Sequence, residues 1–242
     1  MVALSSNAEP SALRSAAPEL HMSTERCHTL PFPELDRLLI EGPVHAVIRV
    51  DPSRRAGMRV TPLTSAGHAL QVNRRGEQLR VRAAGWCAEH ALPLRVEVEV
   101  KTLSELVLAG TAVASIEDVA VDHARVLVMD DARCALDTTA GRWDVDVIDR
   151  GQALVEVQPM VDLRLTLEAR AVVHLIGATD TLHLHANGDS RVRALGPDFA
   201  TEHAVVALRD RADVRLCARG TIRGAIAPTV HLEVRPDQAL FG

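Results

Sequence analysis

Two histidines, His183 and His185, are separated by a single residue. This spacing places both imidazoles on the same outward side of one extended strand. Two imidazoles so placed bind zinc or copper when a third ligand is near, and His174 and His231 are the candidates for that ligand. We expect His174 to lie on another side of the coil. The simpler interpretation of His183 and His185 is that they are solvated polar residues on the surface of a β-sheet. His183 and His185 remain the candidate metal ligands, and no metal or cofactor is assigned.

Two pairs of aspartates have a spacing that suits acid–base chemistry. Asp144 and Asp146 flank one residue and should point outward together, and Asp130 and Asp131 lie at an expected turn. Cleavage of a glycosidic bond uses two carboxyl groups about 5–10 Å apart on either side of the sugar. Paired aspartates on a β-helix surface therefore raise the hypothesis of a polysaccharide-active enzyme.

Two observations oppose an enzymatic role for these aspartates. Aromatic residues make up only 2% of the chain and tyrosine is missing, so the aromatic platforms typical of sugar-binding grooves are scarce. The repeat spacing also predicts that Asp146 lies beside Arg164 and then His183 on successive strands. Mixed ladders of this kind are typical of charge pairs on a solvated sheet surface. We assign no catalytic residue.

Other catalytic and binding motifs are missing from the sequence. There is no Gly-x-Ser-x-Gly nucleophile turn and no Gly-x-x-x-x-Gly-Lys phosphate loop. The cysteines form no Cys-x-x-Cys pair and match no zinc spacing. They are expected to be small apolar core residues or free thiols, although a disulfide that spacing cannot assign is also open. They are Cys27, Cys87, Cys134 and Cys217.

The composition describes a chain with ample material for one large core. Of its 242 residues, 47% are hydrophobic, and the formal net charge is -5. The acidic balance and the shortage of aromatic residues argue against a nucleic-acid partner. No apolar run approaches the about 18 residues that cross a membrane. Residues 1–20 lack the apolar core of a signal peptide, so the compartment stays open.

A repeated strand must position the polar residues. From about residue 103, short strings of alternating apolar and polar residues return about every twenty residues, a spacing typical of solenoids. The strings are 106–108, 126–128, 145–147, 163–165, 182–184, 206–208 and 230–232. A period of two predicts a strand within each string, and no segment carries a sustained helical pattern. We expect an all-β protein, a right-handed parallel β-helix (β-solenoid) of about seven coils.

The sequence predicts three parts along the chain. Residues 1–30 are rich in Ala, Ser, Pro and Glu and are expected to form a flexible leader. Residues 31–102 are expected to form an irregular β N-terminal part of the solenoid, and residues 103–242 the regular coils. Inward residues of the coils should stack in columns. One column is expected to hold Val126, Val145, Leu163, Leu182 and Val206, and the other Val155, Val173, Val192 and Val214.

Three segments of the chain resemble a bacterial family. Residues 34–50, 76–82 and 98–110 are similar, in order and spacing, to the opening strands of the putative auto-transporter adhesin head GIN domain, whose function is unknown. The resemblance covers about residues 34–235 and implies a parallel β-helix-like fold. The family's glycine-rich turn has lost its glycines at most equivalent positions, including 131–134. We therefore expect corners that avoid positive φ or are looser than usual.

These observations favour a non-enzymatic structural or adhesion-type module that presents a stiff surface. The expected partner is an unknown protein or glycan, and a homo-oligomer is also open. A polysaccharide-active β-helix enzyme and a self-assembling scaffold subunit are the alternatives. The resemblance implies a secreted or cell-envelope location, although no signal peptide is visible in the sequence.

Overall fold

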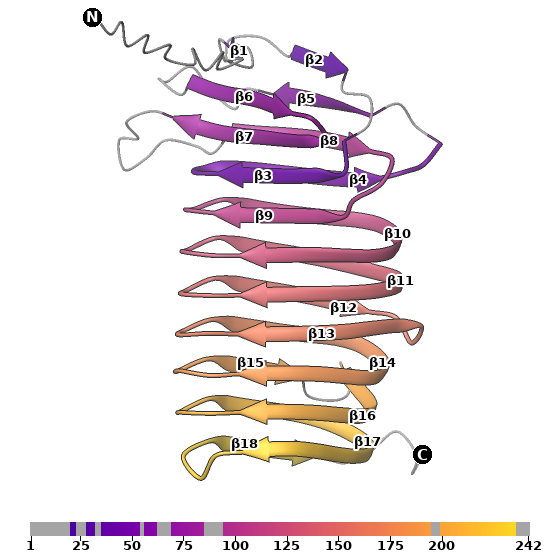
Figure 1. Cartoon of the computed structure of the whole chain (residues 1–242), viewed down its shortest axis with the longest axis vertical. Helices are drawn as coiled ribbons and strands as arrows, with labels where there is room; N and C mark the ends of the chain where they lie inside the picture. The colour runs from indigo at the N-terminus through magenta and orange to yellow at the C-terminus, as the bar shows by residue number, and fades with distance from the viewer. Residues whose placement is uncertain are drawn as a thin grey trace, which may run out of the picture.

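The computed structural model describes residues 20–22, 28–31, 35–53, 56–61, 69–84, 94–194 and 199–235. All regular structure in these ranges is β-strand, and the strands stack as a right-handed parallel solenoid of about 6 turns (Figure 1). The expected fold class is confirmed, and the number of turns is close to the expected seven. In the described part of the chain, no helix is long and apolar enough to cross a membrane.

The strands form an N-terminal group and a group that builds the regular coils. The N-terminal group is β1 (Leu20–Met22), β2 (His28–Pro31), β3 (Arg37–Glu41), β4 (Val44–Val50), β5 (Gly57–Thr61), β6 (Ala69–Arg75), β7 (Gln78–Ala84) and β8 (Leu94–Val100). The coils are built by β9 (Glu105–Ala109), β10 (Val113–Val128), β11 (Arg133–Val147), β12 (Gln152–Val157), β13 (Val161–Leu167), β14 (Val172–Ala186), β15 (Arg191–Ala194), β16 (Phe199–Leu208), β17 (Asp213–Ile226) and β18 (His231–Arg235).

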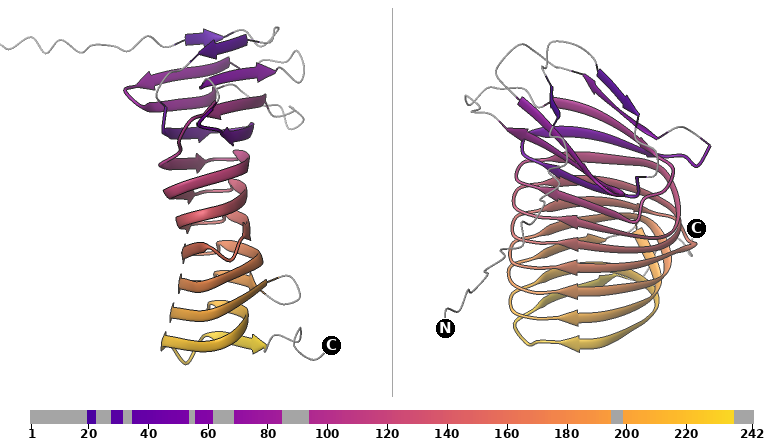
Figure 2. Two further views of the ribbon diagram at one scale, coloured as in Figure 1. Left: turned by 90° about the vertical axis from the view of Figure 1, so that its right-hand side faces the viewer. Right: turned by 45° about the horizontal axis from the view of Figure 1, so that its top comes forward.

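Each regular coil contributes one strand segment to each of two sheets, named here from their places in Figure 1. The back sheet stacks segments 44–50, 113–117, 133–138, 152–157, 172–177, 191–194, 213–217 and 231–235. The front sheet stacks segments 37–41, 105–109, 125–128, 141–147, 161–167, 182–186, 204–208 and 222–226. The sheets meet at a turn edge, where the chain reverses tightly, and at a bend edge, where β10, β11 and β14 curve from back to front (Figure 2).

The turn edge repeats one backbone conformation from coil to coil. Its left-handed position, with φ between 57° and 69°, is occupied by Gly110, Asp130, Asp149, Ala169, Gly188 and Asp210. Loss of glycine has therefore not removed positive φ from the corners, which corrects the expectation from the sequence. Aspartate tolerates this region better than most residues. The carboxylates of Asp130 and Asp210 also accept hydrogen bonds from the backbone N–H of Gly110 and Gly188 in the preceding coil, at 2.8 and 3.0 Å.

The bend edge depends on close contact between successive backbones. Gly141 and Gly177 have φ values of 86° and 98°. A Cβ added at Gly141 would overlap the carbonyl oxygen of Val121, and one added at Gly177 would overlap that of Val157. Glycine is therefore needed at both positions if the strands are to stack while they turn.

Apolar side chains fill the space between the sheets in columns. In the front sheet one column holds Val126, Val145, Leu165, Leu184 and Val206, and its neighbour holds Ala124, Trp143, Leu163, Leu182 and Ala204. The expected column is thus correct at Val126, Val145 and Val206 but wrong at Leu163 and Leu182. Both leucines point inward as expected, but two residues away along the strand.

The columns of the back sheet follow the same rule. Val173, Val192 and Val214 stack as expected, whereas Val155 lies beside Leu175 in the next column. All four valines are fully buried. Burial of each such side chain contributes about 1.5–3 kcal/mol, so these columns stabilise the stacking of successive coils.

The two ends of the solenoid differ. At the N-terminal end, β3 lies between β7 and β9, and β4 lies between β8 and β10. Antiparallel strands then close the parallel stack, because β5 pairs with β8 and β2, and β6 pairs with β7 and β1 (Figure 2). At the C-terminal end, the described chain finishes with β17 and β18, where Ile226 and Val234 are 46% and 44% exposed.

Parts of the expected leader fall outside the described residues, namely 1–19 and 23–27. Within the same range, β1 and the first part of β2 pair with strands of the N-terminal group. Cys27 and Cys87 also lie outside the described residues. Cys134 and Cys217 are buried, and burial raises the pKa of the Cys134 thiol to about 12, which suits a small core residue rather than a reactive thiol.

Candidate functional site

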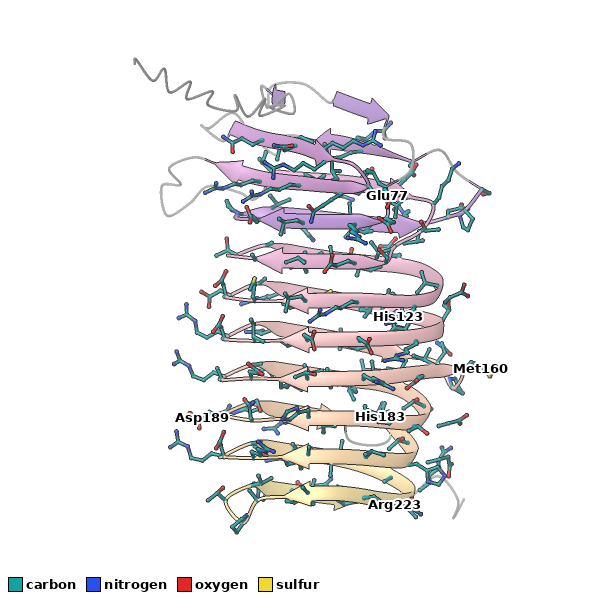
Figure 3. The ribbon with its side chains drawn as sticks, viewed as in Figure 1. Glu77, His123, Met160, His183, Asp189 and Arg223 are labelled. Atoms are coloured by element: carbon teal, nitrogen blue, oxygen red, sulfur yellow. The ribbon has the colours of Figure 1, made fainter. Side chains whose placement is uncertain are left out.

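His183 and His185 lie on the outward side of the front sheet, in the second half of β14. Leu184 between them is buried, as the alternation of a strand requires. Figure 3 shows His183 on the same face as His123 and Arg223, with Met160 at the bend edge and Asp189 at the turn edge. The strand register places His183 beside Arg164 and His185 beside Thr166 of the preceding coil.

The two candidates for a third metal ligand lie on the other sheet, away from His183 and His185. His174 is in the back sheet beside Arg193, and His231 is in the back sheet beside Asp213. Within the described ranges, no group of three His, Cys, Asp or Glu side chains is placed to hold a metal ion. The geometry therefore does not support a metal site at His183.

The register of the paired aspartates differs from the one expected. Asp144, rather than Asp146, lies beside Arg164, and Asp146 lies beside Thr166. Both carboxylates turn toward the preceding coil instead. His123 Nε2 lies 2.8 Å from Asp144 Oδ2, and Arg125 Nη2 donates to Asp146 Oδ2 over 2.7 Å.

The electrostatics of Asp144 do not suit a general acid. Its partial burial opposes ionisation, but hydrogen bonds from His123 and Arg142 and the Arg142 charge outweigh burial and lower the pKa of Asp144. A glycosidase acid needs the opposite shift, since it must carry a proton near neutral pH. The other pair is also engaged at the turn edge, where Asp130 accepts from Gly110 and Asp131 pairs with Arg150.

Two shallow depressions adjoin on the front sheet and share His183. The inner depression, toward the middle of the sheet, is bordered by Arg164, Thr166, His185 and Val205. The outer depression extends toward the bend edge, and the side chains around it include Met160, Asp162, Asp180 and Thr181. This concavity could not be predicted from the sequence, because it depends on the turn between β12 and β13, which brings Met160 to the edge.

Two polar groups around these depressions lack partners among the described residues. Arg164 makes no side-chain hydrogen bond or ion pair within the described part of the chain, because the carboxylate of its register neighbour Asp144 is bound by His123 and Arg142. One carboxylate oxygen of Asp162 is buried without a hydrogen-bond partner. Arg164, with its unpaired guanidinium, and Asp162, with one buried oxygen that lacks a partner, therefore line neighbouring parts of one concave surface.

A comparison with models of protein families identifies the family to which the chain belongs. The family described as "Putative auto-transporter adhesin, head GIN domain" matches residues 42–235. The chain belongs to this family. The match spans every back-sheet segment and every front-sheet segment except 37–41, and it includes the whole of the concave surface around His183, so the surface is part of the head GIN domain.

Solved structures share the fold of this head GIN domain. A putative lipid binding protein from Parabacteroides distasonis has a TM-score of 0.62 at 10% identity, with 87% of this chain and 96% of that chain covered. A putative adhesin from Bacteroides fragilis has a TM-score of 0.61 at 11% identity, covering 88% and 98%. A putative adhesin from Parabacteroides merdae has a TM-score of 0.58 at 15% identity, covering 88% and 95%. No match was found among curated proteins.

Proposed function

We propose that this protein is a non-enzymatic, adhesion-type module that holds a stiff surface toward a protein or glycan partner. Membership of a family named for adhesins supports the adhesion class. The observation that carries the proposal is the construction of the front sheet. Its strands are in parallel register, so outward side chains form straight rows above a buried core.

This construction suits recognition because it is rigid before binding. Each segment of the front sheet is hydrogen-bonded to the next, and the inward columns fix the spacing of the coils. A surface that is already ordered loses little conformational freedom when a partner binds, so less of the interaction energy is cancelled. Polar side chains on loops would lack this advantage.

The chemistry of the front-sheet carboxylates supports a non-enzymatic role. Asp144 is bound by His123 and Arg142, and Asp146 forms an ion pair with Arg125. Partial burial of Asp144 opposes its ionisation, but hydrogen bonds from His123 and Arg142 and the Arg142 charge lower its pKa, away from that of a proton donor. A pair in this state serves to hold neighbouring coils together. Each exposed pair of this type contributes about 0.2–1 kcal/mol to stability.

The test asks whether the protein binds a glycan or protein partner without cleaving a polysaccharide. Purified protein is applied to a glycan array and used in pull-downs from extracellular and envelope protein fractions, and it is incubated with a polysaccharide panel to measure reducing-sugar release. We expect saturable binding to at least one class and no release of reducing sugar. No binding on either arm, or steady release of reducing sugar, would overturn the proposal.

A pair of matched variants shows which of the two sheets contacts the partner. Arg223 of the front sheet and Arg133 of the back sheet are both exposed, and neither has a side-chain partner in the described ranges. Arg223→Glu should weaken binding if the partner lies on the front sheet, whereas Arg133→Glu should leave it unchanged. The two variants reverse the same charge, so a non-specific loss of stability would affect both.

Self-association is the second candidate, and the C-terminal end favours it. Ile226 and Val234 are about half exposed there, while antiparallel strands close the N-terminal end. End-to-end growth therefore stops at a pair joined through the C-terminal ends rather than continuing as a filament. Light scattering should report a dimer that the double variant Ile226→Lys with Val234→Lys converts to a monomer. A monomer in the wild type at high concentration would remove this candidate.

A further inference from the structure

We propose that the joined depressions around His183 bind a saccharide that carries a single carboxylate, such as a terminal uronic or sialic acid. This inference rests on the proposed adhesion function and gives it a ligand class. The binding surface consists of Arg164, Thr166, His183 and His185 in its inner part and Asp162 and Asp180 in its outer part.

The inner part supplies the recognition of a carboxylate. The guanidinium of Arg164 has no side-chain partner among the described residues and borders the inner depression. Guanidinium groups bind carboxylates through two parallel hydrogen bonds, which is stronger and more specific than a point charge. His183 lies about 4.8 Å further along the axis, one strand away, and His185 lies two residues along the same strand, so both imidazoles flank the bound group.

The outer part supplies acceptors for hydroxyl groups. Asp162 and Asp180 border the outer depression together with the Thr181 hydroxyl. Asp180 is exposed, whereas Asp162 is half-buried and one of its oxygens is shielded from solvent, so Asp180 supplies the more accessible acceptors. Carboxylate oxygens only accept hydrogen bonds, and the hydroxyl groups of a sugar ring are suitable donors. The outer part therefore fits the neutral, hydroxylated portion of the same ligand.

Exposed apolar side chains complete the surface at both sides. Val205 borders the inner depression and is 44% exposed, and Met160 borders the outer one and is 81% exposed. These groups offer contact for the C–H faces of a sugar ring without the aromatic platform that the chain lacks. Binding sites that combine apolar contact with a few placed polar groups are typical of small-molecule recognition.

The charge balance of the surface selects one ligand class over related ones. One arginine faces two aspartates across His183. A densely charged polyanion, such as a sulfated glycan or an anionic membrane surface, would meet repulsion from Asp162 and Asp180. A neutral sugar would leave Arg164 without its counter-charge. A ligand with one carboxylate and several hydroxyls matches both parts.

The experiment compares oligosaccharides that end in glucuronic acid or sialic acid with their neutral glucose- or galactose-terminated counterparts, by isothermal titration with the full chain. We expect the acidic ligands to bind at least about 10-fold more tightly, because a charge-assisted pair is worth that factor or more. Arg164→Gln should abolish the preference, and Asp180→Asn should weaken acidic and neutral ligands alike. The control Arg170→Gln, an exposed arginine of the turn edge with no side-chain partner among the described residues, should bind as the wild type.

The outcomes separate this inference from the proposed function. Equal binding of acidic and neutral sugars, or unchanged binding by Arg164→Gln, would overturn the carboxylate inference. Binding of the wild type to a protein partner or to another glycan class, with none of the acidic sugars bound, would also overturn it and would leave the adhesion function standing. Absence of binding to every glycan and protein tested would overturn both. The melting temperature of each variant, measured by circular dichroism, should match the wild type because Arg164 and Asp180 are exposed.

Discussion

The turn edge and the bend edge reverse the same chain by different means. At the turn edge the left-handed position carries a side chain in four coils, at Asp130, Asp149, Ala169 and Asp210. At the bend edge the left-handed positions Gly141 and Gly177 have no room for a Cβ, because a carbonyl oxygen of the coil before occupies its place.

This difference shows that positive φ and the need for glycine are separate requirements. A left-handed residue costs about 1–2 kcal/mol when it carries a Cβ, and at two of the four such positions of the turn edge an aspartate hydrogen bond offsets part of that cost. Asp130 and Asp210 make such bonds to Gly110 and Gly188. The steric overlap at the bend edge has no comparable compensation, so substitutions at the two edges should differ sharply.

The largest loss of stability is expected from the bend-edge substitution Gly177→Ala. The new Cβ would overlap the carbonyl oxygen of Val157, so stacking of β12 on β14 must shift, and the free energy of unfolding should fall by about 3 kcal/mol. Urea denaturation followed by circular dichroism measures it. The control is Gly76→Ala in the hairpin between β6 and β7, which also has positive φ (60°) but nothing within 4 Å of the added Cβ. Equal losses in both variants would mean that φ alone explains the bend-edge glycines.

A smaller contrast lies within the turn edge itself. Asp210→Ala removes the acceptor of the Gly188 N–H, whereas Asp149→Ala removes a side chain at the same left-handed position that makes no such bond. Asp210→Ala should therefore cost about 1 kcal/mol more than Asp149→Ala. Parallel urea titrations of the two variants measure the difference. Identical midpoints would show that aspartate serves only through its backbone preference.

Ala169→Gly should be the one stabilising change. Ala169 has φ 59° and no polar side chain to compensate for the left-handed conformation. Glycine relieves this strain but loses more chain entropy on folding, so a net gain of up to about 1 kcal/mol is expected. The readout is a rise in melting temperature. A fall would show that the turn around residue 169 is held by the alanine methyl group.

The smallest effect on stability is expected at Asp144, which lies on the front sheet between the two edges. The pKa of Asp144 is lowered in the folded protein, since hydrogen bonds from His123 and Arg142 outweigh its partial burial. A lowered pKa means that its contribution is present above the ordinary value of about 3.9 and is lost as pH falls through the folded value. Asp144→Asn should therefore be less stable than the wild type at pH 7, by less than about 1 kcal/mol, and the gap should close below about pH 4. Denaturation at a series of pH values measures the gap. A gap that does not change with pH would contradict the ion pair.

Much of the fold follows from the sequence because a period of two identifies inward residues directly. Val173, Val192 and Val214 stack as the pattern predicts. The same period explains the errors, since a slip of two residues keeps every side chain on its own side. Leu163 and Leu165 both point inward, so the pattern cannot choose between them, and the extra turn after β12 shifts the register.

Less of the candidate site than of the fold could be predicted from the sequence. The shared outward side of His183 and His185 follows from their spacing, and the slip of two residues placed Arg164 beside Asp146 instead of Asp144. Arg164 has no side-chain partner among the described residues, and its register neighbour Asp144 is bound instead by His123 of the strand before and by Arg142. Such competition among three strands depends on side-chain direction, which no one-dimensional pattern records.

The interlocked N-terminal end has a consequence for how the nascent chain folds. Because β3 is held between β7 and β9, and β4 between β8 and β10, the first rungs are complete only when residues up to about 117 are available. From that point each newly synthesised coil meets a finished template and needs contacts only with the coil before it. Folding can then advance in the same direction as translation, one rung at a time, without waiting for the far end of the chain.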